Sequence, residues 1–420
     1  MSVRIKTIAT VILGFGLNFC FAQKQNYSPE IAKYVTFLGT QNTSAKDYVL
    51  NLFKKYDIVI LCERDHREAT QYDLIYDIVS SPYFEKNVGY IMTEVGSYSI
   101  RQDVLNFTKT KFDNDSLKQI RQAEIYRNVF FPPLWNNTNF YNFWGRLNTL
   151  NNTLPEDLQI NLLVSGTKNP TLNETKDSAS MRKYIVENFF SRDSLMASYI
   201  MQTFDSLQRY SNRKKTLVIM NYRHAFSKSL SGDGTINVGD YLFKKYAGRV
   251  ANVYINWMAS TNIIAASDTS KAKMFQNDIE VPIQEGKWDA AFKAAGKENL
   301  GFDFQHSPFG NDSFDIWPDK TDYTYSDIFT GFVFYLPLEK HLIQIGVKNF
   351  LLGADIEKIV NEWNLFNQVT RDKRRFEYTP EHAKELSEDM STYRESDYYA
   401  DTSFYNPAII KPMINQWLKE

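Results

Sequence analysis

Short apolar runs rich in β-branched residues recur along the chain, with longer amphipathic stretches between them. The first two runs are residues 57–62 (DIVILC) and 88–93 (VGYIMT), and a helical stretch over residues 69–80 separates them. Runs that are apolar throughout are typical of strands buried on both faces of a parallel sheet. Two such strands joined by a helix form a right-handed βαβ unit. The alternation predicts an α/β fold, an open, mostly parallel or mixed sheet with helices on both faces.

The same patterns predict the remaining elements. Strands are expected at residues 159–164, 216–220, 250–255 and 329–335, and helices at 45–55, 113–127, 138–150, 177–210 and 238–247. Ser44 is expected to cap the first of these helices. No repeat and no linker rich in Pro, Gly or Ser divides the sequence. Residues 23–345 are therefore predicted to form one α/β domain with helical insertions, on which a mainly helical segment, residues 346–420, packs.

The first 22 residues have the pattern of a secretory signal peptide. Arg4 and Lys6 precede an apolar run from Ile8 to Phe21, and the small residue Ala22 follows it. The run is shorter than the roughly 20 residues that span a bilayer, so cleavage is expected instead of retention as an anchor. The sequence predicts an exported protein, periplasmic or secreted, that does not insert into a membrane after cleavage.

Composition and charge narrow the class of partner. Hydrophobic residues make up 43% of the chain and aromatic residues 15%, which is enough for a sizeable core and argues against disorder. The formal net charge is -1, and the basic residues are spread along the chain, so nucleic acid is not expected to bind. The expected partner is a small-molecule or peptide substrate.

Chemically versatile side chains follow three of the predicted strands. Glu63 and His66 follow the first strand, Glu94 the second, and Arg223 and His224 the fourth. The carboxyl ends of strands border the site in open α/β sheets. A neutral imidazole can take a proton from water at neutral pH. We predict His66 as the general base, supported by Glu63 or Glu94, with His224 and Arg223 facing the oxygen on which negative charge develops.

The order of these motifs resembles that of the erythromycin esterase-like family, within the wider group of TraB/Tiki proteases and ChaN-like haem-binding proteins. The matching segments are residues 62–66 (CERDH), Glu94, residues 192–197 (RDSLMA), residues 221–224 (NYRH) and residues 238–248. The resemblance spans residues 45–260 and implies an esterase-like hydrolase. Arg192, from the matched helix, is then expected to pair with one of the site carboxylates and to belong to the catalytic set.

The sequence departs from the family pattern at three positions. Cys62 stands where the family has Gly, Arg67 where a Gly commonly follows the histidine, and Lys168 where an Asp is usual. These positions bear on loop geometry and substrate choice, so the chain is expected to be a divergent member. Cys62 itself closes a buried strand and is interpreted as a small apolar residue, not as a nucleophile.

Three functions remain open from the sequence. The first is a metal-free hydrolase in which His66 activates water to cleave an ester, lactone or amide. The second is a peptidase-like hydrolase that uses a divalent metal, with His66, His224 and Glu63 as ligands. The third is a haem- or ligand-binding uptake protein without turnover, in which a His or Tyr ligates iron.

Each candidate residue also has a purely structural interpretation. The two histidines could be hydrogen-bonded loop residues, and the acidic residues could cap helices or pair with Arg64 and Arg67. For Asp65 this structural interpretation is preferred, because a carboxylate just before a helix favours its N-terminus. Without the family resemblance, Arg192 and Asp193 would be expected to form a surface pair.

Further aromatic residues and histidines complete the candidate set. The aromatic residues between helices are expected mainly in the core, with a substrate pocket as the alternative: Tyr126, Trp135, Tyr141, Phe143 and Trp144. His306 is considered a third site histidine, on a loop that folds over the site. His341 and His382 are expected on the surface.

Overall fold

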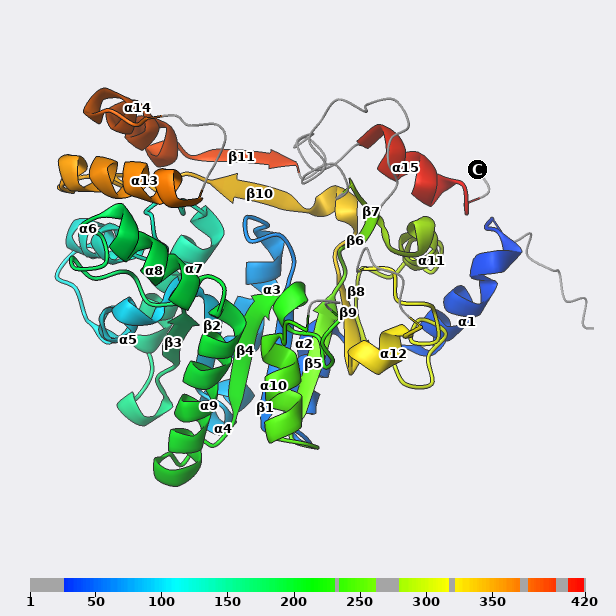
Figure 1. The fold of residues 1–420 in the computed structure, drawn as a ribbon. Coiled ribbons are helices and arrows are strands. Elements are labelled where there is room, and N and C mark those ends of the chain that lie inside the picture. The colour runs from blue at the N-terminus through cyan, green and yellow to red at the C-terminus, as the bar shows by residue number, and fades with distance from the viewer. Residues whose placement is uncertain are drawn as a thin grey trace, which may run out of the picture.

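A seven-stranded sheet forms the centre of the molecule in the computed structural model (Figure 1). The structure describes residues 26–230, 234–261, 279–316, 322–370, 377–397 and 407–418, so the expected signal peptide lies outside the described residues. The strand order is β3-β2-β4-β1-β5-β9-β8. The bounds of these strands are β1 Ile58–Glu63, β2 Tyr90–Ser97, β3 Asn161–Gly166, β4 Thr216–Asn221, β5 Val250–Ile255, β8 Asn299–Asp303 and β9 Gly331–Tyr335.

Six of these strands run parallel and β8 runs antiparallel at one edge. Strand β1 lies in the middle, where Ile58 is opposite Thr216 of β4 and Val250 of β5. At the edge, β8 pairs antiparallel with β9. The α/β prediction of an open, mostly parallel sheet is confirmed. Strands β2, β4 and β1 are neighbours and run parallel. Their carboxyl ends therefore lie side by side at one end of the sheet, which is called the carboxyl-end edge below.

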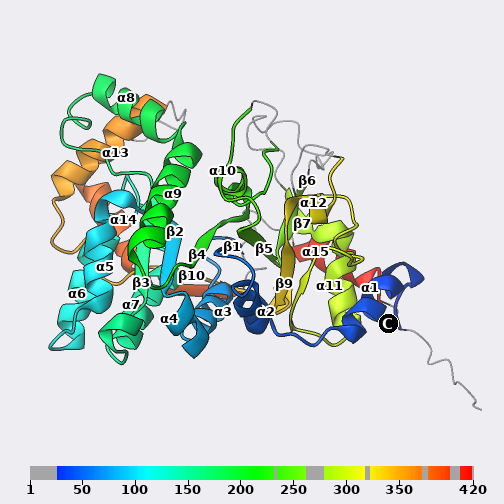
Figure 2. The ribbon, with the colours of Figure 1, turned by 90° about the horizontal axis from the view of Figure 1, so that it is seen from below.

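Helices cover both faces of the sheet, as Figure 2 shows. One face carries α9 (Arg192–Tyr210) and α10 (Val238–Lys245), and the other carries α2 (Ala45–Leu52), α3 (Thr70–Val79), α4 (Pro82–Asn87) and α7 (Thr138–Asn151). Residues of β1 alternate between two apolar clusters, because successive side chains of a strand point to opposite faces. Ile58, Ile60 and Cys62 pack toward α9 and α10, whereas Val59 and Leu61 pack toward α2 and α3.

The remaining elements surround this sandwich. Beyond β3 lie α5 (Arg101–Lys109), α6 (Asp115–Tyr126) and α8 (Ser178–Asn188), and beyond β8 lie α1 (Ala32–Thr40), α11 (Lys287–Ala294) and α12 (Tyr325–Ile328). Two small sheets pair β6 (Met258–Thr261) with β7 (Ile279–Pro282), and β10 (Leu342–Ile345) with β11 (Arg394–Asp397). The last helices are α13 (Ile356–Thr370), α14 (Pro380–Ser391) and α15 (Pro407–Asn415).

The prediction of individual elements was correct for six of the sheet strands and incomplete elsewhere. The stretch 177–210 forms two helices, α8 and α9, with a break at residues 189–191. Strand β2 continues past the predicted end at residue 93 to Ser97. Ser44 caps α2, its hydroxyl accepting a hydrogen bond from the Asp47 amide. Helices α1, α5 and α11 and strand β8 were not predicted.

His341 is buried, which corrects its expected surface position. Its side chain is fully inaccessible, its Nε2 lies 3.2 Å from the Leu336 carbonyl oxygen, and its ring stacks on Trp257 with centroids 5.9 Å apart. Burial and the neighbouring Arg64 guanidinium hold its pKa well below the usual range. The polar residues beside it in sequence concealed this environment. His382 is half-buried in the first turn of α14.

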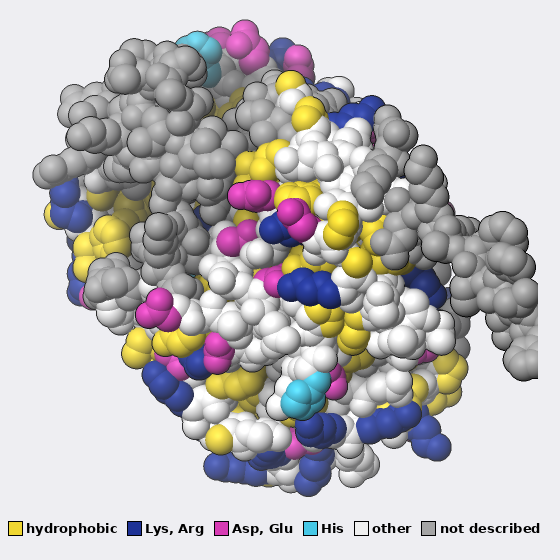
Figure 3. All heavy atoms as spheres, turned by 90° about the vertical axis from the view of Figure 1, so that its right-hand side faces the viewer, with side chains coloured by type: hydrophobic (Ala, Val, Ile, Leu, Met, Phe, Trp, Pro, Cys, Tyr) yellow, Lys and Arg dark blue, Asp and Glu magenta, His cyan; other side chains and the backbone are white. Residues whose placement is uncertain are grey.

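The face that carries α1, α11 and α15 displays both acidic and basic side chains where the structure describes it (Figure 3). Basic and acidic side chains are interspersed there with polar and hydrophobic ones (Figure 3). Lys33 pairs with Asp312 across 3.1 Å, and Lys340 with Glu298 across 2.6 Å. Among the described helices, none is both long and apolar enough to span a membrane.

Candidate active site

The ends of three neighbouring strands deliver the candidate side chains to the carboxyl-end edge of the sheet. Glu63 is the last residue of β1, and its register partner is Asn221, the last residue of β4. The short 3-10 turn η4 (Tyr222–His224) follows β4 directly and carries His224. Glu94 lies on β2, on the other side of β4. Parallel pairing therefore places two carboxylates and an imidazole around the end of β4.

An irregularity in β2 shapes the surroundings of Glu94. The pairing of β2 with β3 is interrupted between Thr93 and Ser97, as in a β-bulge. Gly96 within this interruption has φ +105°, and a Cβ there would lie 2.4 Å from Val164 Cγ1. A Cβ on Gly166 would likewise lie 2.6 Å from the Glu94 carbonyl oxygen. Both glycines are thus needed where the backbones of β2 and β3 approach each other beside the acid.

The first of two carboxylate–imidazole pairs joins Glu63 to His66. His66 Nδ1 donates to Glu63 Oε2 across 3.0 Å, and Tyr72 of α3 donates its hydroxyl to Glu63 Oε1 across 2.5 Å. Glu63 is 2% exposed, whereas the His66 side chain is 24% exposed. Asn139 donates its amide to the His66 carbonyl oxygen across 2.9 Å. The carboxylate is thus fixed by the core, and it orients an accessible imidazole.

The second pair joins Asp193 to His224. His224 Nδ1 lies 2.8 Å from Asp193 Oδ1 and 2.9 Å from Oδ2. Asp193 belongs to the first turn of α9, and its Oδ2 also accepts a hydrogen bond of 3.3 Å from the Val238 amide at the start of α10. This pair therefore ties two helices to the turn that follows β4.

Glu94 is the point on which both pairs converge. Its Oε1 lies 3.2 Å from His224 Nε2, 2.5 Å from Arg192 Nη2 and 3.8 Å from His66 Nε2. Its Oε2 accepts a 2.7 Å hydrogen bond from the Asn221 amide. The predicted pairing of Arg192 with a site carboxylate is present. A separation of 3.8 Å is too long for a hydrogen bond, so His66 Nε2 remains available to water or substrate.

The electrostatics of the group follow from this geometry. Burial alone would lower the pKa of His224, but the carboxylates of Glu94 and Asp193 outweigh it and raise that pKa to about 9. Burial likewise opposes protonation of His66, yet Glu63 and Glu94 raise its pKa above the usual value. For Glu94, burial is outweighed by the His224 and Arg192 cations, which hold its pKa well below the usual range. At neutral pH, His224 is therefore an imidazolium beside an ionised Glu94.

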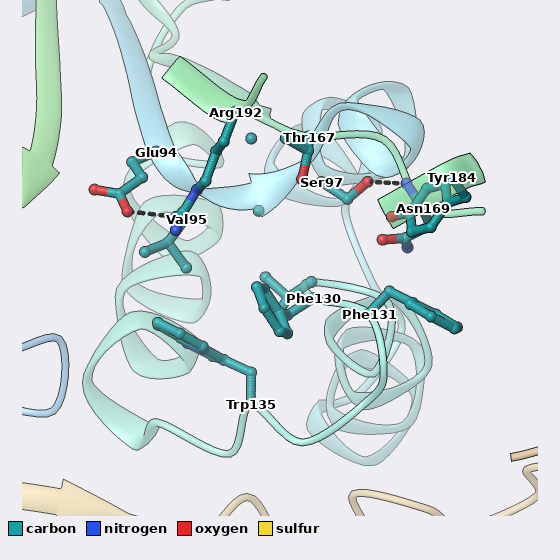
Figure 4. Close-up of a pocket in the computed structure, with 13 residues that line it drawn as sticks. Glu94, Val95, Ser97, Phe130, Phe131, Trp135, Thr167, Asn169, Tyr184 and Arg192 are labelled. Atoms are coloured by element: carbon teal, nitrogen blue, oxygen red, sulfur yellow. Dashed lines mark hydrogen bonds and ion pairs between the residues drawn. The ribbon is translucent and has the colours of Figure 1, made fainter. Parts of the chain in front are cut away.

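A small cleft opens beside Glu94 and Arg192 (Figure 4). Its volume is about 20 Å³, which corresponds to the space of a single water molecule. In Figure 4, Arg192 and Thr167 lie on one side of the cleft, and Trp135 and Phe130 lie on the other. The Trp135 ring also contacts the His66 ring edge-on, with centroids 5.0 Å apart. The cleft is therefore bounded by the carboxylate, the guanidinium and the aromatic neighbour of the imidazole.

The aromatic residues considered for a pocket divide between core and cleft. Tyr126, Phe143 and Trp144 are buried in the apolar cluster on the α3 and α7 face, as expected for core residues. Tyr141 is partly buried against the same cluster. Trp135 is the member of this set that lines the cleft. Its position outside the regular α7 helix, which begins at Thr138, explains the difference.

Other charged residues near the strand ends have structural contacts. Asp65 pairs with Arg67 across 2.8 Å, as its preferred interpretation predicted. Arg64 is fully buried and pairs with Glu68, not with the site carboxylates. Arg223 is exposed, and its Nε lies 3.3 Å from the Tyr222 hydroxyl. Its guanidinium thus lies against Tyr222 in this structure.

Two of the positions that depart from the family pattern also have defined environments. Cys62 is buried in the core, and burial raises the pKa of its thiol well above the usual value. This agrees with its interpretation as a small apolar residue. Lys168 lies over the rings of Tyr98 and Tyr199, 5.7 and 5.9 Å from their centroids. Its ammonium group therefore packs against an aromatic pair.

His306 lies near the amino ends of the parallel strands, whereas the site lies at their carboxyl ends. This corrects its expected position over the site. Strand β8 is antiparallel, and its last residue, Asp303, is opposite Gly331, the first residue of β9. The loop after β8 therefore leaves from the amino ends of the parallel strands, away from Glu94. His306 is exposed there with φ +65°. The antiparallel direction of β8 could not be read from its sequence.

The donor set does not fit a divalent metal. Of the predicted ligands, Glu63 and His66 Nδ1 face each other and not a common ion. The Arg192 guanidinium on Glu94 Oε1 puts a positive charge where a cation shared with His224 would have to lie. Within the described ranges, no group of three or more His, Cys, Asp or Glu side chains has an arrangement suited to a metal. The arrangement of these side chains therefore supports no metal-dependent step.

Two residues of the site were not predicted. Asp193 was expected to form a surface pair with Arg192 if the family resemblance is set aside, and it was not named as a site residue. Tyr72 was not singled out. Both come from helices, α9 and α3, whose rotation about their axes decides which side chains face the carboxyl-end edge. The signal for Asp193 was present, because it stands within the matched RDSLMA segment. No comparable signal marked Tyr72.

Comparison with known proteins gave weak similarities. No protein-family model matches the chain, and no curated protein matches it. A mutant of the erythromycin esterase EreC in its open conformation is 10% identical, with a TM-score of 0.44 over 74% of this chain and 96% of that one. A succinoglycan biosynthesis protein is 8% identical, with a TM-score of 0.44 over 72% and 96%. Haem-bound ChaN of Campylobacter jejuni is 12% identical, with a TM-score of 0.29 over 55% and 88%.

Proposed function

We propose that this protein is an exported hydrolase in which His66 activates water for attack on an ester, lactone or amide. The observation that carries the proposal is the arrangement of His66. Its Nδ1 is bonded to the buried carboxylate of Glu63, and its Nε2 makes no hydrogen bond to any described residue. An imidazole held in this way has one fixed tautomer and a free basic nitrogen, as a general base requires.

The other site residues supply positive charge for the reaction. The His224 imidazolium and the Arg192 guanidinium both contact Glu94 Oε1, and Asp193 also pairs with His224, so two carboxylates hold the two cations in place. Positive charge that is held in place before the substrate binds stabilises the oxyanion of a tetrahedral intermediate. Glu94 does not touch the substrate in this scheme. It keeps both cations in place and keeps His224 protonated.

The proton transfers then follow from these positions. The attacking water gives a proton to His66 Nε2 while its oxygen bonds to the substrate carbonyl carbon. Glu63 stabilises the imidazolium that forms, since its Oε2 accepts from Nδ1. When the intermediate collapses, His66 returns the proton to the leaving oxygen or nitrogen. One water is consumed, and an acid and an alcohol or amine are released.

The test is hydrolysis of an ester panel by the purified mature chain. His66→Ala should lower kcat by about a hundredfold or more, the usual effect of removing a general base. His224→Ala should also lower kcat, because an oxyanion-stabilising cation is lost. His306→Ala, near the amino ends of the parallel strands, is the matched control and should leave kcat unchanged. Unchanged activity in both site variants would exclude this site.

The alternative functions give different observables on the same sample. Bound Zn, Mn or Co at one equivalent, with activity lost on chelation, would favour the metal-dependent hydrolase. A strong Soret band without turnover would favour haem binding. Export is tested separately by fractionation of the host cell and by the N-terminal residue of the mature protein. A mature chain that begins after Ala22 is the expected result.

A further inference from the structure

A second pocket adjoins the small cleft beside Glu94 and Arg192. It has a volume of about 230 Å³ and lies between residues 127–133, residues 169–170 and the start of α13. A cavity of about 150 Å³ holds benzene. The second pocket, called the polar pocket below, can therefore hold a six-membered ring together with polar substituents.

The polar pocket is lined by a carboxylate, Glu362, that accepts no hydrogen bond from any described residue. The Glu362 side chain is 15% exposed. Its nearest cation is Lys358 Nζ at 3.8 Å, beyond hydrogen-bond distance. Burial raises the pKa of Glu362 above its usual value. A largely desolvated acceptor of this kind gains most from a ligand that brings hydroxyl or amino donors.

The remaining walls select among such ligands. Arg127 and Lys358 balance Asp355 and Glu362, so neither an anion nor a cation is favoured overall. Phe130 and Phe131 contribute aromatic surface to the same pocket. A sugar ring meets both conditions, because it is neutral, carries several hydroxyl donors and presents apolar C–H faces that pack on aromatic rings.

The polar pocket lies next to the small cleft beside Glu94 and Arg192. Phe130, Phe131 and Asn169 line both spaces, and all three are labelled around the cleft in Figure 4. A ligand in the polar pocket is therefore a direct neighbour of the cleft, with Phe130 between them. We infer that the polar pocket binds a sugar ring and that the substrate is an O-acylated sugar, an inference that rests on the proposed hydrolase function.

The test compares two esters with the same acetyl group, 6-O-acetylglucose and 4-nitrophenyl acetate. Glu362→Gln should raise KM for 6-O-acetylglucose by about tenfold, the size of a lost hydrogen bond to a charged group. Its kcat/KM for 4-nitrophenyl acetate should stay unchanged, since Glu362 lies outside the cleft. Glu357→Gln, an exposed glutamate on the same helix, is the matched control and should change neither value.

Binding without turnover separates this inference from the proposed function. Saturation-transfer NMR with methyl glucoside should give a signal with the wild-type chain and a much weaker one with Glu362→Gln. Equal effects of Glu362→Gln on both esters, or no methyl glucoside signal, would overturn the sugar pocket and leave the hydrolase intact. If neither ester is hydrolysed but methyl glucoside binds through Glu362, the hydrolase proposal fails and the sugar site stands.

Discussion

Glu94 faces every cation of the site. It is 3% exposed, and its Oε1 faces His66, His224 and Arg192. A buried carboxylate is stable only when it is paired, so the cations fix its charge and it fixes theirs. Glu94, His66 and His224 titrate as a coupled set, and pH profiles should report the set as a whole.

The pH profile of kcat/KM should be bell-shaped. The base must be neutral, so activity rises with pH through the raised pKa of His66, above about 6.5. The cation must stay protonated, so activity falls as pH passes about 9, where His224 loses its proton. Glu94→Gln removes a carboxylate that helps to raise the pKa of both histidines, after Glu63 in the case of His66, and should move both limbs to lower pH. Limbs that stay in place in Glu94→Gln would contradict this assignment.

Asp193 should act on the reaction through His224. Asp193→Asn keeps the size of the side chain but removes the charge that helps to raise the pKa of His224. The alkaline limb of the kcat/KM profile should move below pH 9, and the acidic limb should not move, because Asp193 does not contact His66. Asp205→Asn is the control. Asp205 lies farther along α9, and its carboxylate pairs with Lys245 of α10. A uniform loss of activity with unchanged limbs would indicate a merely structural role.

How much of the site could be predicted depends on which element carries each residue. Glu63, Glu94 and His224 were predicted from strand ends, because parallel pairing brings such ends together whatever the intervening chain does. Arg192 was expected from the motif resemblance alone. Side chains on helices, such as Asp193, depend on packing that residue spacing does not fix.

At the scale of elements, the bulge in β2 should be the most sensitive backbone feature of the site. Gly96→Ala adds a Cβ 2.4 Å from Val164 Cγ1 at a positive φ, so it should destabilise the fold by about 2–4 kcal/mol. Gly248→Ala isolates the effect of φ, because Gly248 has φ +75° and open space around it, and should cost about 1 kcal/mol. Urea unfolding measures both. Equal losses would mean that the contact with Val164 carries no cost.

The elements that escaped prediction lack the patterns that mark the others. Strand β8 reads NLGFD, with a glycine inside and exposed polar residues at both ends, and its pairing with β9 alone makes it a strand. The break between α8 and α9 falls at residues 189–191 (FFS), which contain no Gly or Pro to signal the end of a helix. Buried strands such as β1 and β5 were correctly predicted because six consecutive buried positions require an apolar run.

At the scale of the whole molecule, Arg64 joins parts of the sheet that are far apart in sequence. Its side chain is fully buried. It donates to Glu68 Oε2 across 2.9 Å, to the Asn256 carbonyl and side-chain oxygens across 2.8 and 2.6 Å, and to the Tyr335 carbonyl oxygen. Asn256 follows β5 and Tyr335 ends β9. One guanidinium thus satisfies carbonyl groups at the ends of two strands while it anchors the segment that contains His66.

This buried pair should be costly to break and much less costly to remove together. Arg64→Met leaves Glu68 buried without its cation and should destabilise the fold by about 3–5 kcal/mol. Arg64→Met with Glu68→Gln should lose less than the sum of the two single variants, because no uncompensated charge remains. Lys340→Met, in an ion pair with both side chains about half exposed, is the control and should cost about 1 kcal/mol or less. The cycle comprises the wild type, Arg64→Met, Glu68→Gln and the double variant, and urea unfolding measures the stability of each. Strict additivity of the losses would show that Arg64 and Glu68 stabilise the fold independently. Since Arg64 lies two residues before His66, the single variant should also lower kcat, whereas Lys340→Met should not.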